Sequence, residues 1–318
     1  MKIVFHGANA STFVPGFAEL LEAPHDVVVL SDDLTGPGEP EILAGADVVV
    51  GVRLTASHPR LAARLYQVPG AGTDGIDRAA LPAGCALCNC FGHEPAIAEW
   101  VMAALLSRHV PLADADARLR RGDWRYWAGH PGGLRTELGA ETLGVVGWGH
   151  IGKAVAARAA AFGMTVHVAN RSQVADEAVA AEFRLDALAE MAAGVDVLLV
   201  TLPLTDATRG IVGAEVLSAM KPHAIVMNVG RGAVIDEDAL YDALAGGRIG
   251  GAVVDTWYVY PTPADPNPLP GNKPFHLLPN VTLTPHMSGW TTGTVSRRRA
   301  VIADNVNRLA SGVPPINR

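Results

Sequence analysis

Short apolar runs alternate with helical stretches over the first ninety residues of the chain. The helical stretches are Phe13–Leu21 and Pro59–Arg64, and the Pro and Gly cluster Gly36-Pro37-Gly38 predicts a loop. Because strands and helices take turns along the chain, we expect a parallel sheet. The apolar runs predict its strands at Ile3–Phe5, Val27–Leu30, Val48–Val52, Leu65–Val68 and Ala86–Asn89.

A second series of alternating elements begins after a long helix over Glu94–Arg108. Its clearest helices are Gly213–Met220 and Asp236–Ala245. The predicted strands are Leu143–Val146, Thr165–Val168, Val197–Thr201, Ala224–Val229, Ala252–Asp255 and Val281–Thr284. A last helix, Thr294–Leu309, follows the second sheet, and we expect it to return to the first domain.

These patterns predict an α/β fold with two Rossmann-like, doubly wound parallel-sheet domains. Residues 1–93 and 290–318 would form a discontinuous, flavodoxin-like substrate (catalytic) domain. Residues 94–289 would form a dinucleotide-binding domain. A chain of 318 residues is long enough for two domains of ordinary size.

A glycine-rich turn marks the start of the second domain. The strand Thr142–Val146 leads into Gly147-Trp148-Gly149-His150-Ile151-Gly152, and the Ala-rich helix Lys153–Phe162 leads out. In a dinucleotide-binding turn the first glycine allows the tight bend, the second admits the pyrophosphate, and the third permits helix–strand packing. We therefore expect Gly147, Gly149, His150, Ile151 and Gly152 to bind a dinucleotide at the helix N-terminus.

The tip of the next strand bears on the choice of cofactor. A carboxylate there would bind the 2′-hydroxyl of NAD and repel a 2′-phosphate. This chain instead has Asn170, Arg171 and Ser172, an amide, a guanidinium and a hydroxyl suited to a dianionic phosphate. The alternative is a solvated loop arginine. We favour NADP, preferably as NADPH, and keep NAD as possible.

Composition excludes several classes of protein. The chain is 49% hydrophobic and 18% charged, which favours a large packed core over disorder. Its net charge of −7 argues against nucleic acid or an anionic membrane as the partner. No apolar run has the length of a signal peptide or a membrane span, so we expect a cytoplasmic protein. Cys85, Cys88 and Cys90 are expected to be core residues, and we expect no metal site.

Three short motifs follow strands of the second domain: Asn228-Val229-Gly230-Arg231-Gly232, Asp255-Thr256-Trp257, and Thr284-Pro285-His286-Met287-Ser288-Gly289. With Gly70-Ala71-Gly72-Thr73-Asp74 and with Thr201-Leu202-Pro203 and Thr208, they occur in the order typical of one family. Over nearly its whole length the chain resembles the D-2-hydroxyacid dehydrogenases, relatives of glyoxylate and hydroxypyruvate reductases and of formate dehydrogenases.

The residue types suit the reduction of a 2-oxo acid, and the resemblance implies the same roles. Arg231 can hold the carboxylate and carbonyl of the substrate together through its planar fork. His286 can deliver a proton near neutral pH. The alternatives are an ordinary surface arginine and a core histidine.

The resemblance also implies further contacts. The backbone near Ala71 and Gly72 would bind the substrate carboxylate, with Arg53 as a weaker candidate. Asp255, Ser288 and Gly289 would contact the nicotinamide. The remaining cofactor contacts would come from Leu202, Pro203, Thr208, Val229 and Gly230.

One position departs from the family pattern. A glutamate that supports the histidine normally stands five residues after the strand-end aspartate, and that place here is Tyr260. Without a carboxylate partner, the imidazolium form of His286 should be less favoured. Formate dehydrogenases have a glutamine there and begin the same motif with Asp-x-Trp. Glu94 is another carboxylate that could serve His286.

We therefore expect an oxidoreductase that reduces a small 2-oxo acid, of the glyoxylate or hydroxypyruvate type, with NADPH. The alternatives are a formate-dehydrogenase-like oxidation of a small anion and a non-catalytic, dinucleotide-sensing relative. The resemblance and the apolar helical run Ala96–Met102 also predict a homodimer.

Overall fold

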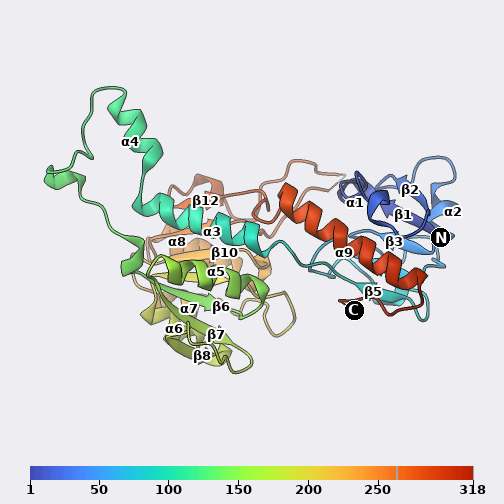
Figure 1. The fold of residues 1–318 in the computed structure, drawn as a ribbon. Helices are drawn as coiled ribbons and strands as arrows, with labels where there is room; N and C mark the ends of the chain where they lie inside the picture. Colours follow the sequence, from blue (N-terminus) through green and yellow to red (C-terminus); the bar gives the residue numbers. More distant parts are fainter. Residues whose placement is uncertain (263, 318) are drawn as a thin grey trace. The chain divides into compact units, whose positions relative to one another are not determined.

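The computed structural model describes residues 1–262 and 264–317 (Figure 1). They divide into two compact units. The first unit comprises residues 1–93 and 290–318, and the second comprises residues 94–289. Each unit contains one sheet, and every strand pairing in both sheets is parallel. The expected α/β class with two parallel sheets is confirmed.

The sheet of the first unit has five strands among the described residues, in the order 2-1-3-4-5 of flavodoxin-like folds. At its centre Phe5 lies between Val29 on one side and Val50 on the other. In sheet order the strands are β2 (Asp26–Leu30), β1 (Lys2–His6), β3 (Val48–Val50), β4 (Leu65–Gln67) and β5 (Ala86–Cys88). Each of the predicted strands of this unit is therefore present.

The last helix of the chain packs in the core of the first unit. Ile302 and Val306 of α9 (Thr292–Ala310) belong to one buried cluster with Phe5 and Phe13. Asn305 on the same helix donates to Gln67 of β4 over 2.6 Å, with both side chains fully buried. Burial of the apolar side chains of α9 therefore stabilises the packing of residues 290–318 with residues 1–93.

The prediction of two continuous helices early in the chain was wrong. Phe13 and Phe17 are both buried, but Gly16 takes a left-handed φ of 76° between them, so the segment forms turns followed by a short 3-10 helix at Ala18–Leu20. Residues 59–63 have no helix, and Leu61 and Ala63 are buried at the alternating spacing of extended chain. Short helices form instead at α1 (Gly7–Ser11) and α2 (Glu39–Ala44).

The sheet of the second unit has seven strands among the described residues, one more than the pattern predicted. The additional strand, β8 (Ala181–Arg184), pairs with β7 at the sheet edge and is only partly buried. In sheet order the strands are β12 (Val281–Leu283), β11 (Gly251–Val254), β10 (Ile225–Asn228), β9 (Val197–Val200), β6 (Thr142–Val146), β7 (Thr165–Asn170) and β8. From β6 the chain first adds β7 and β8 on one side and then adds β9 to β12 on the other. The strand order therefore reverses between β6 and β9, and ligands usually bind at such a switch point.

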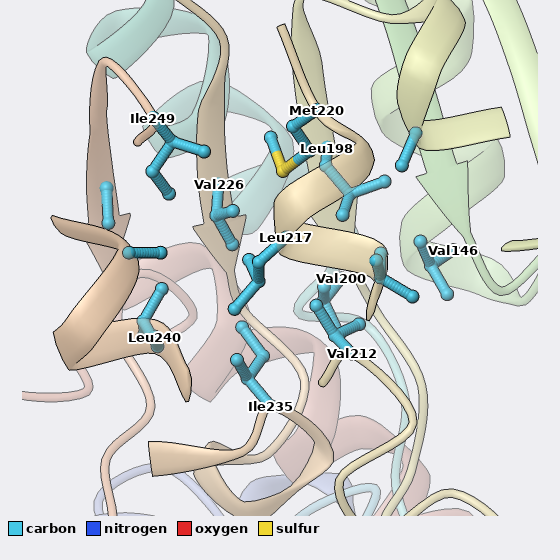
Figure 2. Close-up of a cluster of buried hydrophobic side chains, with 14 of the residues drawn as sticks. Val146, Leu198, Val200, Val212, Leu217, Met220, Val226, Ile235, Leu240 and Ile249 are labelled. Carbon is cyan, nitrogen blue, oxygen red and sulfur yellow. The ribbon is translucent and has the colours of Figure 1, made fainter. Parts of the chain in front are cut away.

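Helices cover both faces of this second sheet. One buried cluster joins α3 (Glu94–His109) and α5 (His150–Ala161) to strands β6, β7 and β9. The other holds α6 (Leu188–Gly194), α7 (Ala214–Ala219) and α8 (Glu237–Ala245) against the opposite face. Figure 2 shows its centre, where Leu217 and Met220 lie near Leu198 and Val226. Strands covered on both faces explain the continuous apolar runs in the sequence.

The apolar run that suggested a homodimer is largely covered within the chain. Ala96 is buried, and Ile97, Ala98, Val101 and Met102 are buried in the core of the second unit. Several large exposed apolar side chains lie on the next segment, residues 110–137, which we call the arm. It consists of α4 (Leu112–Leu119) and a loop, and it extends away from the body of its unit (Figure 1). Its exposed apolar side chains are Leu112, Leu119, Trp124, Trp127 and Leu134.

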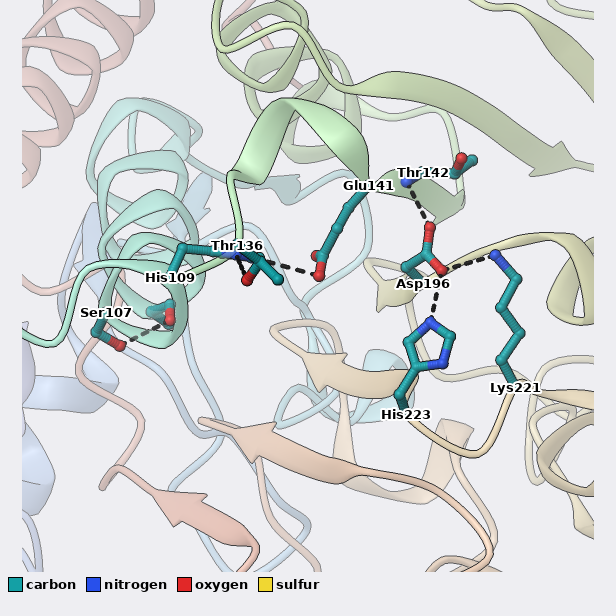
Figure 3. Close-up of polar contacts among 9 residues, drawn as sticks. Ser107, His109, Thr136, Glu141, Thr142, Asp196, Lys221 and His223 are labelled. Carbon is teal, nitrogen blue, oxygen red and sulfur yellow. Dashed lines mark hydrogen bonds and ion pairs between the residues drawn. The ribbon is translucent and has the colours of Figure 1, made fainter. Parts of the chain in front are cut away.

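Polar clusters secure the amino-terminal ends of the strands (Figure 3). Asp196, just before β9, accepts from the Thr142 N–H at 2.8 Å, from Lys221 at 2.6 Å and from His223 at 3.0 Å. His109, at the end of α3, contacts the Thr136 hydroxyl over 2.8 Å and Glu141 over 3.3 Å. These groups lie at the sheet edge opposite the glycine turn, so their role is to hold the fold together.

Within residues 1–262 and 264–317, none of the helices is long and apolar enough to cross a membrane. The cysteines lie in or near the core of the first unit, as expected. Cys88 and Cys90 are fully buried, and burial raises the pKa of the Cys90 thiol to about 12. Cys85 is partly buried, and burial raises its pKa to about 11.

Candidate active site

The predicted cofactor residues of the second unit follow the carboxyl ends of its parallel strands. Such ends lie at one edge of a sheet, where ligands bind in doubly wound folds. Gly147 follows β6, Asn170 ends β7, and Leu202 comes just after β9. Val229 follows β10, Asp255 follows β11, and Ser288 lies in the loop after β12. The topology thus brings to one edge residues that are up to 141 positions apart, from 147 to 288.

The glycine turn has the geometry that a dinucleotide requires. Gly147 has a φ of 103°, a left-handed conformation that favours glycine. A side chain on Gly152 would collide with the Gly147 carbonyl, so the third glycine permits close packing. Gly149, in contrast, faces open space, and no side chain caps the helix that begins at His150. Uncapped amide donors beside open space fit a pyrophosphate.

Two polar residues brace the glycine turn. The Thr201 hydroxyl donates to the carbonyl of Gly147 over 2.9 Å. Asn170 accepts from the Trp148 N–H over 3.2 Å and donates to the Ser172 carbonyl over 2.9 Å. The amide of Asn170 therefore joins the turn to the tip of β7. Arg171 and Ser172 are exposed at that tip.

The loop after β9 is held in shape by Thr208. Its buried hydroxyl donates to the Pro203 carbonyl over 2.7 Å and accepts from the Thr205 N–H over 2.8 Å. A side chain on Gly230 would approach the Leu202 carbonyl at 2.6 Å. Glycine at this position therefore lets the loops after β9 and β10 pack backbone to backbone.

Arg231 sits on a loop that Asn228 braces from the end of β10. Asn228 accepts from the Gly230 N–H at 3.0 Å and donates to the Arg231 carbonyl at 3.1 Å. The guanidinium of Arg231 donates to the Gly230 carbonyl at 2.9 Å. Gly232 packs so closely on the backbone of Trp257 that any side chain would collide there. This contact joins the Arg231 loop to the loop that follows β11.

Asp255 organises the loop that carries His286. Its fully buried carboxylate accepts from the Thr284 hydroxyl at 2.5 Å and from the N–H groups of Met287 and Ser288, each at 2.9 Å. His286 between them has a left-handed φ of 55°, which is costly for a residue with a side chain. Three bonds to one carboxylate stabilise this conformation and fix the direction of the imidazole.

The side chain beside His286 is Tyr260, the residue that the resemblance predicts in the place of the family's glutamate. The hydroxyl of Tyr260 lies 2.9 Å from His286 Nδ1 and accepts from the Trp257 N–H over 3.1 Å. Partial burial raises the pKa of Tyr260, so the hydroxyl is protonated at neutral pH. Glu94, the other carboxylate considered, has an oxygen 3.8 Å from His150 Nδ1, next to the glycine turn.

The candidate substrate residues belong to the first unit. Arg53 follows β3 and is exposed, and Ala71 and Gly72 lie in the loop after the neighbouring strand β4. The side chain of Asn89 donates to the Ala71 carbonyl over 2.8 Å. Leu54 pairs with Ile76, which joins the two loops. Arg53, Ala71 and Gly72 therefore lie at one edge of the five-stranded sheet.

Asn228 and Trp257 hold this site together, although the sequence motifs do not predict this role. Both residues lie within the motifs that follow the strands, yet nothing in the sequence assigns them a bracing role. The indole N–H of Trp257 donates to the Thr284 carbonyl over 2.8 Å and so joins two strand-end loops. A buried Trp between polar neighbours was the available signal, because a buried indole N–H needs an acceptor.

The fold and this edge define a dinucleotide-binding α/β oxidoreductase. Residues 102–288 match the model of the D-isomer specific 2-hydroxyacid dehydrogenase NAD binding domain. The chain belongs to this family, and it is an NAD(P)-dependent 2-hydroxyacid dehydrogenase. It is 36% identical over 275 residues to a glyoxylate reductase of Aeropyrum pernix, covering 83% of this chain and 79% of the relative.

Two solved structures extend the comparison. An NADPH-dependent glyoxylate/hydroxypyruvate reductase from Sinorhizobium meliloti, in complex with NADP and malonate, matches with a TM-score of 0.77 and 27% identity. The match covers 99% of this chain and 95% of that one. An acyclic imino acid reductase in complex with NADPH and D-Arg matches with a TM-score of 0.78 and 26% identity, over 100% and 99% of the two chains.

Proposed function

We propose that the protein reduces small 2-oxo acids of the glyoxylate or hydroxypyruvate type to 2-hydroxy acids, with NADPH as the preferred cofactor. The observation that carries this proposal is the joined pair of loops after β10 and β12, which present Arg231 and His286 at the cofactor edge. Relatives of the same family are a glyoxylate reductase and an NADPH-dependent glyoxylate/hydroxypyruvate reductase.

Each residue has a proposed task in this reaction. Arg231 binds the substrate carboxylate and polarises the ketone through two parallel N–H bonds. In the first unit, the backbone at Ala71 and Gly72, with Arg53, is our candidate for binding a carboxylate, and we propose this unit as the substrate domain. Bound NADPH supplies the hydride to the carbonyl carbon. His286 gives a proton to the carbonyl oxygen, so the product is a neutral alcohol.

The cofactor assignment rests on the tip of β7. Arg171 and Ser172 are exposed there, while Asn170 is bonded to the glycine turn. A guanidinium and a hydroxyl suit the 2′-phosphate of NADP. Leu202, Pro203, Thr208, Val229 and Gly230 would make the remaining cofactor contacts, and Asp255, Ser288 and Gly289 would contact the nicotinamide.

We further propose that the protein is a homodimer formed through the arm. The arm exposes Trp124, Trp127 and Leu134 at 64%, 59% and 88%. Several of its charged groups are paired within it, as in the pair Arg118–Asp114 at 2.7 Å. A segment with an exposed apolar surface is typical of a subunit contact.

A second candidate is favoured by Tyr260. Reduction of a protonated 2-imino acid adds hydride to a C=NH₂⁺ carbon and yields a neutral amine, so the protein need not supply a proton. Oxidation of formate likewise requires no general acid. A phenol in place of the carboxylate suits such reactions, and one structural relative is an acyclic imino acid reductase.

One assay separates these candidates. Absorbance of reduced nicotinamide is followed with NADPH or NADH and with glyoxylate or hydroxypyruvate, each with and without methylamine, and in the reverse direction with formate. We expect NADPH oxidation with the 2-oxo acids alone. A rate that requires methylamine would favour the imino acid reaction. If the protein binds NADPH but turns over none of these substrates, a sensing role is favoured.

Two variants test the proposed roles of Arg231 and His286. We expect Arg231→Ala to raise KM and lower kcat together, because the arginine binds the substrate in both the ground and transition states. His286→Ala should lower kcat with cofactor affinity unchanged. Unchanged turnover by His286→Ala on each active 2-oxo acid would show that the proton comes from elsewhere.

A further inference from the structure

The polarity of the hydrogen bonds around Tyr260 differs from what a carboxylate would provide. The Trp257 N–H can only donate, so the Tyr260 oxygen is the acceptor of that 3.1 Å bond. The hydroxyl then has its own hydrogen to direct at His286 Nδ1, 2.9 Å away. A glutamate in this position would be an acceptor toward both neighbours. Tyr260 therefore replaces an acceptor with a donor.

A donor at Nδ1 selects one form of the imidazole. Neutral imidazole has one N–H and one acceptor nitrogen. When Nδ1 accepts from Tyr260, the ring hydrogen is on Nε2. The imidazolium would instead have to donate from Nδ1 to an oxygen that already accepts from the Trp257 N–H, so the hydrogen of the Tyr260 hydroxyl would have to turn away.

The surrounding structure keeps this geometry in place. The rings of Tyr260 and His286 lie at a tilt of 54°, with their centroids 5.6 Å apart. Asp255 holds the backbone on both sides of the imidazole, and Trp257 anchors the same loop at Thr284. Since both partners are held by other bonds, little conformational entropy is lost in forming the Tyr260–His286 contact.

The charged groups around Tyr260 leave its hydroxyl protonated. Partial burial raises the pKa of Tyr260, and the negative charge of Asp255 acts in the same direction. The N–H of Trp257 and the positive charge of Arg231 act in the opposite direction, and the net pKa remains raised.

We propose that Tyr260 is a positioning residue that holds His286 as the neutral Nε2–H tautomer. The expected effect of this tautomer on the reaction rate rests on the proposed function. Reduction of a 2-oxo acid consumes a proton at the substrate oxygen, so a site that favours neutral His286 should lose rate at a lower pH than a site with a carboxylate. Reduction of a protonated imine would not depend on this proton.

The first test reads the tautomer directly and needs no substrate. Nitrogen NMR of the ¹⁵N-histidine-labelled protein distinguishes a ring N–H from an acceptor nitrogen, and the His286 signals are assigned by their loss in His286→Gln. We expect Nδ1 as the acceptor and Nε2 as the N–H at neutral pH. Tyr260→Phe should give a mixture of tautomers. A protonated Nδ1 in the wild-type protein would overturn the proposal.

The second test reads the pH profile of kcat. Tyr260→Glu should move the decline in rate upward by about one pH unit or more, because a carboxylate favours the imidazolium. Tyr260→Phe lacks the donor and should lower kcat without that upward shift. Tyr241→Phe, which removes a hydroxyl from α8 in the same unit, is the matched control and should change neither readout.

These readouts separate the two proposals. A protein with the Nε2–H tautomer but no activity on 2-oxo acids would refute the proposed function and support the role of Tyr260. Turnover of 2-oxo acids, with an unchanged tautomer and pH profile in both folded Tyr260 variants, would support the proposed function and refute the role of Tyr260. If Tyr260→Glu does not fold, the NMR comparison with the near-isosteric Tyr260→Phe still decides the matter.

Discussion

Asp196→Asn should destabilise the second unit without touching the candidate active site. Asp196 precedes β9 at the amino-terminal edge of the sheet, and its side chain is only 12% exposed. One carboxylate oxygen accepts from the Thr142 N–H, and the other accepts from both Lys221 and His223 (Figure 3). These bonds join the starts of β6, β9 and β10. The carboxamide has one acceptor oxygen, so its NH₂ must face at least one donor.

The cost follows from the bonds that are lost. A hydrogen bond between the Thr142 N–H and a charged oxygen contributes roughly 1.5–3 kcal/mol. The pair with Lys221, whose side chain is 32% exposed, adds only about 0.5–1 kcal/mol because solvent screens it. We therefore expect Asp196→Asn to lower the free energy of unfolding by about 2–4 kcal/mol.

Urea denaturation at neutral pH measures this difference. Lys221→Met is the matched control, because it removes the exposed partner and leaves the buried Thr142 bond in place. It should cost no more than about 1 kcal/mol. A loss below about 1 kcal/mol for Asp196→Asn, or an equal loss for both variants, would refute the assigned importance of the Thr142 bond.

The same variant has a predicted pH dependence. Burial acts to raise the pKa of Asp196, but the bonds from Lys221, Thr142 and His223 together outweigh burial, and the net pKa is lowered. The unfolded chain therefore binds a proton more readily than the folded protein does. The stabilising effect is complete above the unfolded pKa of about 3.9 and is lost as the pH falls toward the folded pKa. The gap between wild type and Asp196→Asn should narrow in that window, and a gap that widens there would contradict this sign.

Three further predictions concern the cofactor, the loops and the arm. Arg171→Ala should weaken NADPH about ten- to a hundred-fold while NADH is nearly unaffected, and equal losses in a binding titration would contradict the phosphate role. Gly232→Ala should cost about 1–3 kcal/mol in thermal or urea unfolding and lower kcat, because its side chain meets the Trp257 backbone. Gly194→Ala, which faces open space, is the control and should be nearly neutral. Light scattering should give twice the 33.2 kDa chain mass, and Leu134→Glu on the arm should shift it toward the monomer.

Several elements of the fold were not predictable from the local pattern. The spacing of Phe13 and Phe17 imitates a helix, but Pro15 and the left-handed Gly16 between them impose turns, and both rings are buried by tertiary packing. The edge strand β8 has an alternating, half-buried pattern, weaker than the continuous apolar runs of the central strands. Its existence depends on pairing with β7, which no local signal encodes.

The sequence by itself determined the parallel sheets, the glycine turn and the set of residues that follow the strand ends. Apolar runs and glycine spacing encode these features locally, and parallel pairing then brings the carboxyl ends to one edge. Only the tertiary structure decided how side chains meet within that edge. The family resemblance suggested Tyr260 as the neighbour of His286, but the two are 26 positions apart, and the geometry of their contact depends on how Asp255 and Trp257 fold two irregular loops. Loop conformations of this kind are set by long-range hydrogen bonds, because they have no period for the sequence to display.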